Sequence, residues 1–363
     1  MPDPNYDDAF AQRLLAWHQA HPRPLPWKAH PDAYTIWLSE IILQQTRVEQ
    51  GLPYFERFRE KYPTVEALAH APEDDVMKLW EGLGYYSRAR NLHGTAKVVA
   101  SELDGKFPDT YEGLLQLKGV GAYTAAAIAS FAYNLPHAVL DGNVFRVLAR
   151  YLGLSVAIDS TEGKKLFARK AQDLLDTEHP AAYNQAVMDF GATWCTPRNP
   201  RCADCPMSPD CVAFQQNQIE LFPVKSKKLE KKDRFFHYLV ISAGEHTFLQ
   251  KRLEKDIWQQ LYEFPMIEKE ALASDAGDLS QSPIWQALIG EKPYVLKAIA
   301  GPYRQTLTHQ KVAALFFEIQ LQSVDNPNTA PFIAVESKNL NNFAFPKVID
   351  YYLKDNSLYL KLL

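Results

Sequence analysis

The stretch Leu117-Lys118-Gly119-Val120-Gly121-Ala122-Tyr123-Thr124 decides how the first part of the chain folds. Before it, Asp109 or Thr110 can cap a short helix, and after it residues 124–131 are almost all apolar and predict a second helix. The two glycines permit a turn that residues with a Cβ resist. We therefore predict a helix, a tight hairpin and a helix. The alternative is an ordinary buried turn between two helices, and the glycines alone favour it.

The hairpin also predicts a phosphate-binding site. The backbone amides of Lys118, Gly119, Val120 and Gly121, with the positive end of the second helix, can hold a phosphate oxygen without contacting a base. A net charge of −4 argues only weakly against nucleic acid as the partner, because a total says nothing about a local patch.

The chain length predicts two domains, since 363 residues are too many for one typical core. No segment approaches the roughly 20 apolar residues that a membrane helix needs, and the N-terminus lacks a basic region followed by an apolar one. We therefore expect a cytoplasmic monomer, associated with the nucleoid if the organism is a bacterium.

Residues 1–214 predict an all-α domain, because apolar residues recur at helical spacing and no stretch before residue 200 favours a strand. The expected helices cover residues 8–19, 34–58 (two helices with a break near Gly51 to Pro53), 67–83, 91–103, 141–153, 161–175 and 181–193. Residues 215–234, which are rich in Gln and Lys, predict a linker that either is solvated or contacts a nucleic-acid backbone.

Residues 235–363 predict an α+β domain. Its expected strands lie at 236–242, 248–252, 294–300 and 312–320, and its expected last helix at 346–353.

Two carboxyl side chains of the helical domain have unusual surroundings. Glu40 lies among Trp37, Ile41 and Ile42, where a carboxyl has a raised pKa and can hold a proton near neutral pH. A surface glutamate flanked by core residues has the same pattern. Asp141 precedes a helix, and its preference as an N-cap is enough to explain it structurally.

The sequence Tyr85-Tyr86-Ser87-Arg88-Ala89-Arg90 combines two aromatic rings, which can stack on or wedge between bases, with two cations that can meet phosphates. A core tyrosine pair beside solvated arginines is the alternative interpretation.

The four cysteines predict a metal centre. They all lie in one proline-rich loop, as Cys195, Cys202, Cys205 and Cys211. Disulfide bridges would be spread along the chain and are typical of secreted proteins. The spacing does not separate a four-thiolate zinc site from an iron-sulfur cluster.

Taken together, these features resemble the adenine DNA glycosylase (MutY) family of the helix-hairpin-helix DNA-repair superfamily. The matching segments are residues 37–46, 82–88, 117–124 and 140–150 and the four-cysteine loop, in order along nearly the whole chain. The resemblance implies an enzyme of base excision repair that flips adenine mispaired with 8-oxoguanine or guanine out of duplex DNA and removes it. It also implies a 4Fe-4S cluster, rather than zinc, on the four cysteines.

The resemblance assigns roles to single residues. Glu40 is the acid that protonates adenine at N7, and Asp141 is the ionised carboxylate that stabilises the oxocarbenium-like sugar. Tyr123 and Asn143 support the pocket around them, while Gln45 and Tyr85 probe or wedge at 8-oxoguanine. Relatives similar to endonuclease III carry a lysine at position 123 that forms a Schiff base and cuts the strand. A tyrosine there predicts a monofunctional glycosylase.

The C-terminal half resembles a Nudix-like domain that recognises 8-oxoguanine. Residues 257–265 match its Trp-Glu-Phe-Pro region, with Tyr262 in place of the tryptophan, and no dense acidic pattern for magnesium follows. We therefore expect binding without hydrolysis. The family's Phe-Ser-His loop becomes Leu307-Thr308-His309, which leaves Thr308 and His309 as the candidate contacts.

Three other functions remain open at this point. They are an endonuclease III-like glycosylase and lyase, which Tyr123 and the long C-terminal domain oppose, a DNA-binding protein without catalysis, and a Nudix hydrolase, which the missing acidic pattern opposes.

Overall fold

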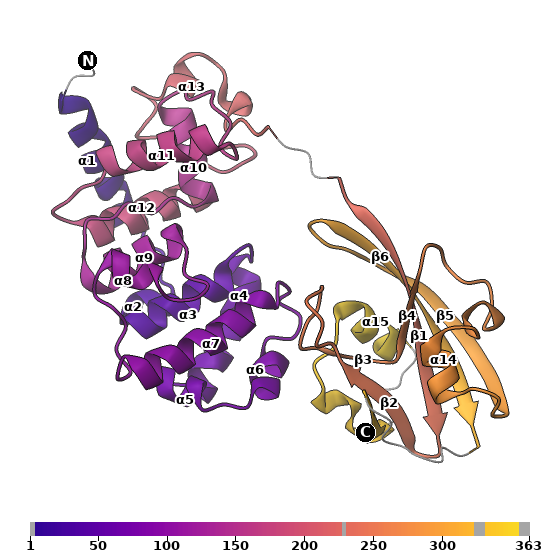
Figure 1. Cartoon of the computed structure of the whole chain (residues 1–363). Helices are drawn as coiled ribbons and strands as arrows, with labels where there is room; N and C mark the ends of the chain where they lie inside the picture. Colours follow the sequence, from indigo (N-terminus) through magenta and orange to yellow (C-terminus); the bar gives the residue numbers. More distant parts are fainter. Residues whose placement is uncertain (1–3, 227–229, 323–330, 356–363) are drawn as a thin grey trace. The chain divides into compact units, whose positions relative to one another are not determined.

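The computed structural model describes residues 4–226, 230–322 and 331–355 (Figure 1). Its contacts divide the chain into two compact units. The first comprises Met1–His70 and Asn91–Lys228, and the second comprises Ala71–Arg90 and Leu229–Leu363. In the described part of the chain, no helix is long and apolar enough to cross a membrane.

In the described residues of the first unit, all the regular secondary structure is helical (Figure 1). Its helices are α1 (Pro4–Ala20), α2 (Pro26–Ala29), α3 (Ala33–Leu43), α4 (Val48–Lys61), α5 (Val65–Ala69), α7 (Ser87–Glu102, which begins in the second unit), α8 (Tyr111–Leu115), α9 (Ala122–Tyr133), α10 (Gly142–Tyr151), α11 (Thr161–Asp173), α12 (Pro180–Thr193), α13 (Val212–Gln215) and the 3-10 helix η1 (Ile219–Leu221).

The predicted hairpin joins α8 to α9. Thr110 caps α8 by accepting a hydrogen bond from the Gly113 N–H at 3.1 Å. Gly119 has a φ of +81°, and a Cβ there would lie 2.8 Å from the Cβ of Asn91 on α7. Gly119 is therefore required by both its backbone conformation and its close approach to α7. Gly121 has an extended backbone, and a Cβ added to it would meet nothing within 4 Å, so only one of the two glycines is needed for the turn.

Two helix boundaries differ from the prediction. The break in residues 34–58 falls at 44–47, not near Gly51 to Pro53, which both lie inside α4. Gly51 packs so closely on α3 that a Cβ would lie 2.6 Å from Leu43 Cδ2, so it serves packing and not chain reversal. The helix expected at 67–83 is split into α5 and α6 (Glu73–Leu79), because Pro72 has no N–H to continue the first of them.

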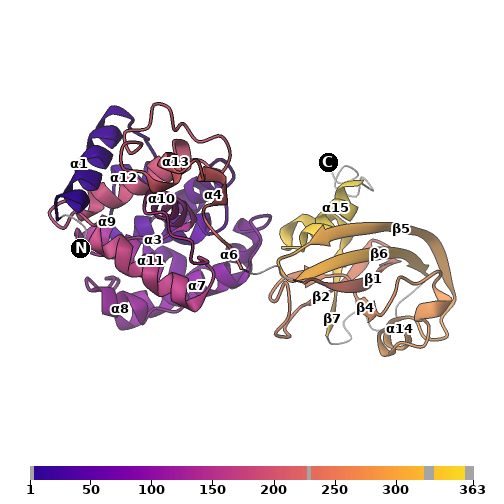
Figure 2. The ribbon, with the colours of Figure 1, turned by 90° about the horizontal axis from the view of Figure 1, so that it is seen from above.

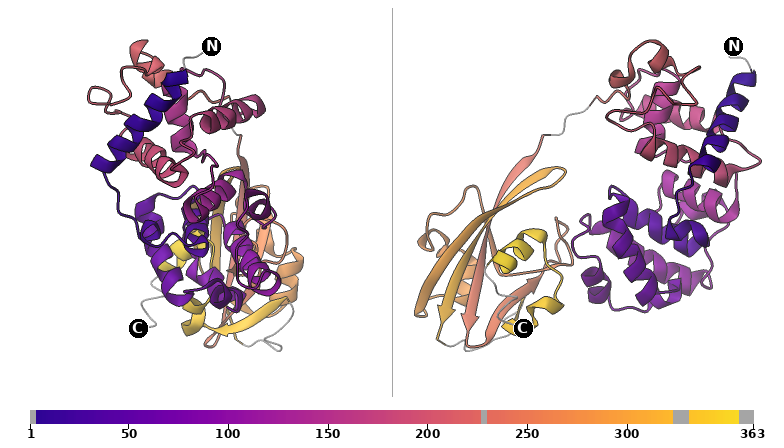
Figure 3. Two further views of the ribbon diagram at one scale, coloured as in Figure 1. Left: turned by 90° about the vertical axis from the view of Figure 1, so that its left-hand side faces the viewer. Right: turned by 180° about the vertical axis from the view of Figure 1, so that it is seen from behind.

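The N-terminal helix packs against α12 and lies at the same end of the unit as the cysteine loop (Figure 3). Phe10 and Leu14 of α1 are fully buried in a core that also contains Phe190 of α12. An ion pair of 2.5 Å between Arg13 and Asp210 ties α1 to the cysteine loop. The loop is therefore held by the helical core on one side and by α1 on the other.

The second unit contains a seven-stranded mixed sheet (Figure 2). Its strands are β1 (Lys232–Ala243), β2 (His246–Lys251), β3 (Tyr262–Glu263), β4 (Met266–Lys269), β5 (Tyr294–Thr306), β6 (Gln310–Leu321) and β7 (Phe332–Glu336). The order is β3-β2-β1-β6-β5, with β4 paired to β1 and β7 paired to β2. Only β1 and β6 run parallel among these pairs, with Lys232 opposite Gln310 and Ala243 opposite Leu321.

Helices cover both faces of this sheet (Figure 2). On one face Tyr352 of α15 (Lys347–Asp355) stacks on Phe316 of β6, with ring centroids 4.0 Å apart. On the other, Trp285 of α14 (Pro283–Leu288) packs in a cluster with Phe317, the next residue of β6. The unit also contains α6 and the 3-10 helices η2 (Gly277–Leu279) and η3 (Ser337–Asn342). Because both faces of β6 are covered, its residues 312–317 are all buried, which fits the continuous apolar run in its sequence.

The predicted linker, 215–234, is partly structured. Phe222 is 7% exposed and packs in the core of the first unit, and β1 begins at Lys232. The Gln and Lys residues near Phe222 in the sequence made the composition of this segment typical of a linker, so the burial of Phe222 was not predicted. Lys227 and Lys228 of the predicted basic run lie outside the described residues. The short strands β3, β4 and β7 and the helix α14 were not predicted, because segments this short show no measurable period.

Candidate active site and cysteine centre

Glu40 lies on the buried side of α3. It is 7% exposed, between Trp37 at 1% and Ile41 at 4%. Desolvation by these neighbours raises the pKa of Glu40 to about 7, and the hydrogen bond from the Tyr123 hydroxyl only partly opposes this rise. The negative charge of Asp141 adds to it. The structure thus brings Glu40, Tyr123 and Asp141 together in one unit, and Glu40 can hold a proton near neutral pH.

Asp141 caps α10. One carboxylate oxygen accepts from the N–H groups of Asn143 at 2.8 Å and Val144 at 2.7 Å, and the other accepts from Asn143 Nδ2 at 2.8 Å. Burial raises the pKa of Asp141, while these three donors and the charge of Arg146 oppose the rise. Glu40 has only the Tyr123 hydroxyl to oppose its rise. The donors therefore favour an ionised Asp141 beside a protonated Glu40.

Arg146 connects this carboxylate to the cysteine loop, a role that the sequence analysis missed. Its Nη2 donates to Asn143 Oδ1 at 2.9 Å and to the Gly191 carbonyl at 2.6 Å, and its Nε donates to the Cys195 carbonyl at 2.8 Å. A Cβ on Gly191 would lie 2.7 Å from Asn143 Cβ, so α10 and α12 meet here without room for a side chain. Asp141, Asn143 and Arg146 therefore form one hydrogen-bonded series that ends on the first cysteine. Arg146 is 7% exposed. The available sequence signal was an arginine between the apolar residues Phe145 and Val147 of an expected helix.

A second buried carboxylate was also missed. Asp189 of α12 is 3% exposed and accepts from Lys28 at 2.5 Å, His18 at 3.1 Å and Arg23 at 3.3 Å. Burial alone would raise the pKa of Asp189, but the hydrogen bonds from His18 and Lys28 and the charge of Arg23 outweigh it and lower the pKa. These three basic side chains tie α12 to the N-terminal segment of the chain.

The hairpin is positioned by α7. Thr95 Oγ1 donates to the Lys118 carbonyl at 2.6 Å, and Val120 is buried. The Val120 N–H donates to the Leu117 carbonyl at 3.1 Å, so this amide serves the turn and not an external phosphate. Lys118, Gly119 and Gly121 are exposed, and phosphate binding by them stays a prediction.

Gln45 follows the C-terminus of α3. It is exposed and has a φ of +56°, an uncommon value for a residue with a side chain. Gln44 just before it donates to Thr124 Oγ1 of α9 at 3.2 Å, which fixes the chain next to Tyr123. The structure therefore presents Gln45 at the surface from a well-anchored backbone.

The second unit brings Tyr85 and Thr308 together. Their hydroxyl groups lie 2.9 Å apart, and Tyr85 is 47% exposed with a φ of +48°. Thr308 and His309 lie in the turn between β5 and β6, which the Leu307 N–H closes by donating to the Gln310 carbonyl. The two segments that the sequence linked to the same base thus meet in this unit.

Arg88 does not occupy the surface position that the sequence suggested. It is 8% exposed, its guanidinium lies 5.0 Å from the Trp80 ring and 5.6 Å from the Tyr85 ring, and it donates to the Gly84 carbonyl. Burial lowers its pKa to about 10. A phosphate contact does not fit this burial. Arg88 instead supports the loop that carries Tyr85.

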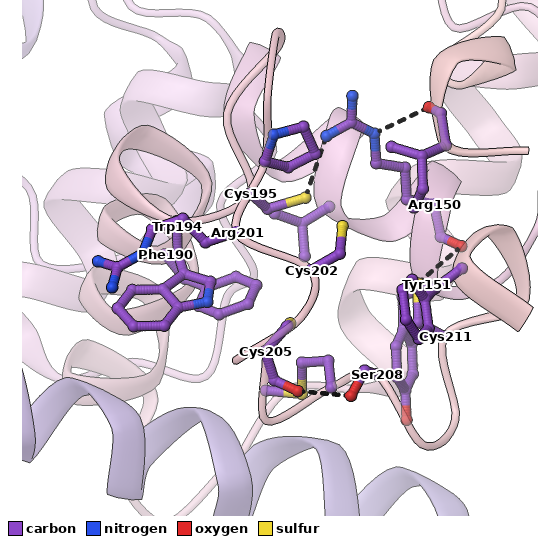
Figure 4. A pocket seen from close by; sticks show the side chains of 15 residues that line it. Arg150, Tyr151, Phe190, Trp194, Cys195, Arg201, Cys202, Cys205, Ser208 and Cys211 are labelled. Atoms are coloured by element: carbon purple, nitrogen blue, oxygen red, sulfur yellow. Dashed lines mark hydrogen bonds between the residues drawn. The ribbon is translucent and has the colours of Figure 1, made fainter. Parts of the chain in front are cut away.

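The four cysteines line one cavity, which Figure 4 shows from close by. Phe190 and Trp194 lie on one side of them and Arg150 and Tyr151 on the other. Arg150 is 3% exposed, and its Nη1 donates to Cys195 Sγ at 3.4 Å and to the Thr196 carbonyl at 2.8 Å. Among the described residues, no three His, Cys, Asp or Glu side chains are close enough together to hold a single metal ion.

The chemistry of this cavity fits a bound metal group. Burial raises the pKa of the Cys205 thiol to about 12 and also raises the pKa values of Cys202 and Cys211. A metal supplies the positive charge that makes thiolates stable in such an apolar site. Four thiolates are the donor set of both zinc sites and iron-sulfur clusters, but among the described residues these sulfurs lie too far apart to hold a single ion.

Comparison with known proteins identifies the family. The model of the HhH-GPD superfamily base excision DNA repair protein matches residues 38–175, and the NUDIX domain model matches residues 237–355. The adenine DNA glycosylase of Buchnera aphidicola subsp. Acyrthosiphon pisum is 35% identical over 262 residues, which are 72% of this chain and 75% of that protein. The chain belongs to the adenine DNA glycosylase family. It is thus a DNA N-glycosylase of base excision repair.

Other relatives agree with this assignment. The adenine DNA glycosylase of Mus musculus is 44% identical over 219 residues, 58% of this chain and 42% of its own length. Among solved structures, a thermostable thymine-DNA glycosylase has a TM-score of 0.54 at 30% identity and covers 58% of this chain and 97% of its own. A non-covalent endonuclease III-DNA complex, at 19% identity and a TM-score of 0.51, shares the fold. The predicted fold class, a helix-hairpin-helix domain followed by a Nudix-like domain, is confirmed.

Proposed function

We propose that this adenine DNA glycosylase removes adenine mispaired with 8-oxoguanine or guanine, through acid catalysis by Glu40. The observation that carries the proposal is the buried Glu40 carboxyl, whose pKa of about 7 leaves about half of it protonated at neutral pH beside Tyr123 and Asp141. Adenine is a poor leaving group, so cleavage of its N-glycosidic bond needs a proton on the base. Glu40 would deliver that proton to N7 of adenine.

Asp141 would act on the sugar. As the bond to adenine breaks, positive charge develops on the sugar, and a carboxylate held ionised by three hydrogen bonds stabilises that charge. Because its donors are fixed by the start of α10, the carboxylate needs no reorganisation during the reaction. Asn143 would hold the carboxylate, and Tyr123 would hold Glu40.

The base has to leave the duplex before this chemistry, since Glu40 is buried. Gln45 and Tyr85 are the exposed side chains proposed to probe or wedge at the opposite base. Thr308 and His309 would contact 8-oxoguanine from the Nudix-like domain, and the hydroxyl pair of Tyr85 and Thr308 supports a shared role. We propose that this domain binds the damaged base without hydrolysing nucleotides.

The remaining parts of the proposal concern cofactor and assembly. Cys195, Cys202, Cys205 and Cys211 would hold a 4Fe-4S cluster, which supplies four iron-thiolate bonds that brace the loop. We propose residues 1–214 as the glycosylase domain, 215–234 as the connection and 235–363 as the 8-oxoguanine domain of a monomer. Its DNA substrate would place it at the nucleoid in a bacterial cell.

A single-turnover assay tests the substrate and the reaction together. Duplexes with adenine opposite 8-oxoguanine, guanine or cytosine should lose adenine at rates that fall in this order, because only the first two are the proposed mispairs. Borohydride added to the same reactions should trap no covalent DNA adduct, since Tyr123 has no amine to form a Schiff base.

Two outcomes of that assay would contradict the proposal. Equal rates of adenine release opposite 8-oxoguanine and opposite cytosine would contradict the proposed role of the Nudix-like domain in recognising the opposite base. Efficient trapping would show lyase chemistry, and a Tyr123→Lys variant would serve as the comparison for how much adduct an amine at this position produces.

The pH dependence of adenine release should follow from Glu40. Its proton is present below pH 7 and lost above it, so the single-turnover rate should be constant below the pKa of about 7 and fall about tenfold per pH unit above it. At low pH the rate should fall again as Asp141 takes up a proton. A rate that kept rising through pH 8 would exclude Glu40 as the acid.

A further inference from the structure

Trp194, the residue just before Cys195, carries a buried hydrogen-bond donor that has no partner among the residues the structure describes. Its side chain lines the cysteine cavity and is 7% exposed. Within the part of the chain that the structure describes, its indole Nε1 has no hydrogen-bond partner. Buried N–H groups are nearly always paired, so a lone donor on the wall of a sulfur-lined cavity indicates an acceptor that belongs there.

Other contacts make this indole a strong donor. The guanidinium of Arg201 lies 3.8 Å from the centre of the Trp194 ring. A cation over the ring face withdraws electron density and so makes the N–H more acidic. Arg150 already donates to Cys195 Sγ from the other side of the cavity. The cavity wall therefore carries a donor on each side, of which Arg150 already contacts a cysteine sulfur.

Hydrogen bonds to sulfur change the reduction potential of an iron-sulfur cluster. Each added electron makes the cluster more negative, and a donor stabilises the more negative state more strongly. A hydrogen bond from the protein thus raises the potential, and its removal lowers it.

We propose that the indole N–H of Trp194 donates a hydrogen bond to a sulfur atom of the bound cluster and raises its reduction potential. The inference rests on the proposed iron-sulfur cofactor. It makes Trp194 a positioning and tuning residue of the cofactor, and Arg201 its supporting cation. No proton is transferred, and the electron comes from the electrode or from a one-electron redox partner.

Trp194→Phe tests this, because phenylalanine keeps a ring in the core but has no N–H. In film voltammetry of the intact protein, the midpoint potential should move to a more negative value. A tenfold change in the ratio of oxidised to reduced cluster corresponds to a shift of about 59 mV for one electron.

Trp17→Phe is the matched control. Trp17 is 6% exposed, its Nε1 also has no partner among the described residues and its ring lies 5.8 Å from that of Trp194, but it does not line the cavity, so it controls for repacking around Trp194. The midpoint potential of the cluster in Trp17→Phe should equal that in the unaltered protein.

Iron and acid-labile sulfide analysis of the unaltered protein tests the cofactor assignment separately from the hydrogen bond of Trp194. Zinc in place of iron would overturn the cofactor assignment and this inference with it. An intact cluster with equal potentials in Trp194→Phe and Trp17→Phe would overturn the inference alone. If Trp194→Phe lost its cluster during purification, the unaltered protein labelled with ¹⁵N-tryptophan would decide. Electron-nuclear double resonance of its paramagnetic cluster should show coupling to an exchangeable indole proton, and no coupling would overturn the inference.

Discussion

Glu40→Gln should bind adenine-containing duplexes about as tightly as the unaltered enzyme and release adenine about 10²–10⁴-fold more slowly. Glutamine has the same size and can still accept the hydrogen bond from Tyr123, so the packing around α3 should survive. It has no acidic proton to deliver, however. Single-turnover cleavage and a binding titration on the same duplex measure the two quantities separately.

The control for this variant is Glu102→Gln, which changes an exposed glutamate at the end of α7. It should behave as the unaltered enzyme in both measurements. A protein that only binds DNA predicts that Glu40→Gln changes nothing, so unchanged cleavage would overturn the assignment of Glu40. Lost binding together with lost cleavage would indicate a folding defect, which thermal unfolding would reveal.

Asp141→Asn should slow adenine release by about 10²–10³-fold while the fold survives. Asparagine is as good an N-cap as aspartate, so the bonds from the Asn143 and Val144 amides can remain. The negative charge that stabilises the cationic sugar is lost. The fall of the rate at low pH should disappear as well, because the group that titrates there is gone. A pH profile of single-turnover rates and a melting curve measure both effects.

Asp176→Asn is the matched control for Asp141→Asn. Asp176 Oδ1 accepts from the N–H groups of Glu178 and His179 at 2.9 Å each, two and three residues along the chain as at Asp141, in the turn before α12, whose N-cap is His179. If Asp141→Asn and Asp176→Asn lowered the rate equally, Asp141 would be a structural cap only. If Asp141→Asn kept the full rate, electrostatic stabilisation by this carboxylate would be excluded.

The residues that the sequence identified best are those whose chemistry is set by near neighbours along the chain. Thr110 caps α8, Asp141 caps α10 and Gly119 makes the turn, as their positions next to apolar helices predicted. The apolar residues on either side of Glu40 predicted its raised pKa, because they are its neighbours on the same helix. The cysteine loop was predicted for the same reason, since all four thiols are close in sequence.

What the sequence alone determined was therefore the local chemistry: the hairpin, the caps, a carboxyl in apolar surroundings and four thiols in one loop. Only the tertiary structure decided which distant groups meet. It placed Arg146 between Asn143 and Cys195, surrounded Asp189 with cations from the N-terminal segment and turned Arg88 inward beneath Tyr85. It also left the Trp194 N–H facing a cysteine cavity without a partner among the described residues. Such contacts join helices far apart in the chain, and the packing of the whole domain fixes them because no single segment contains both partners.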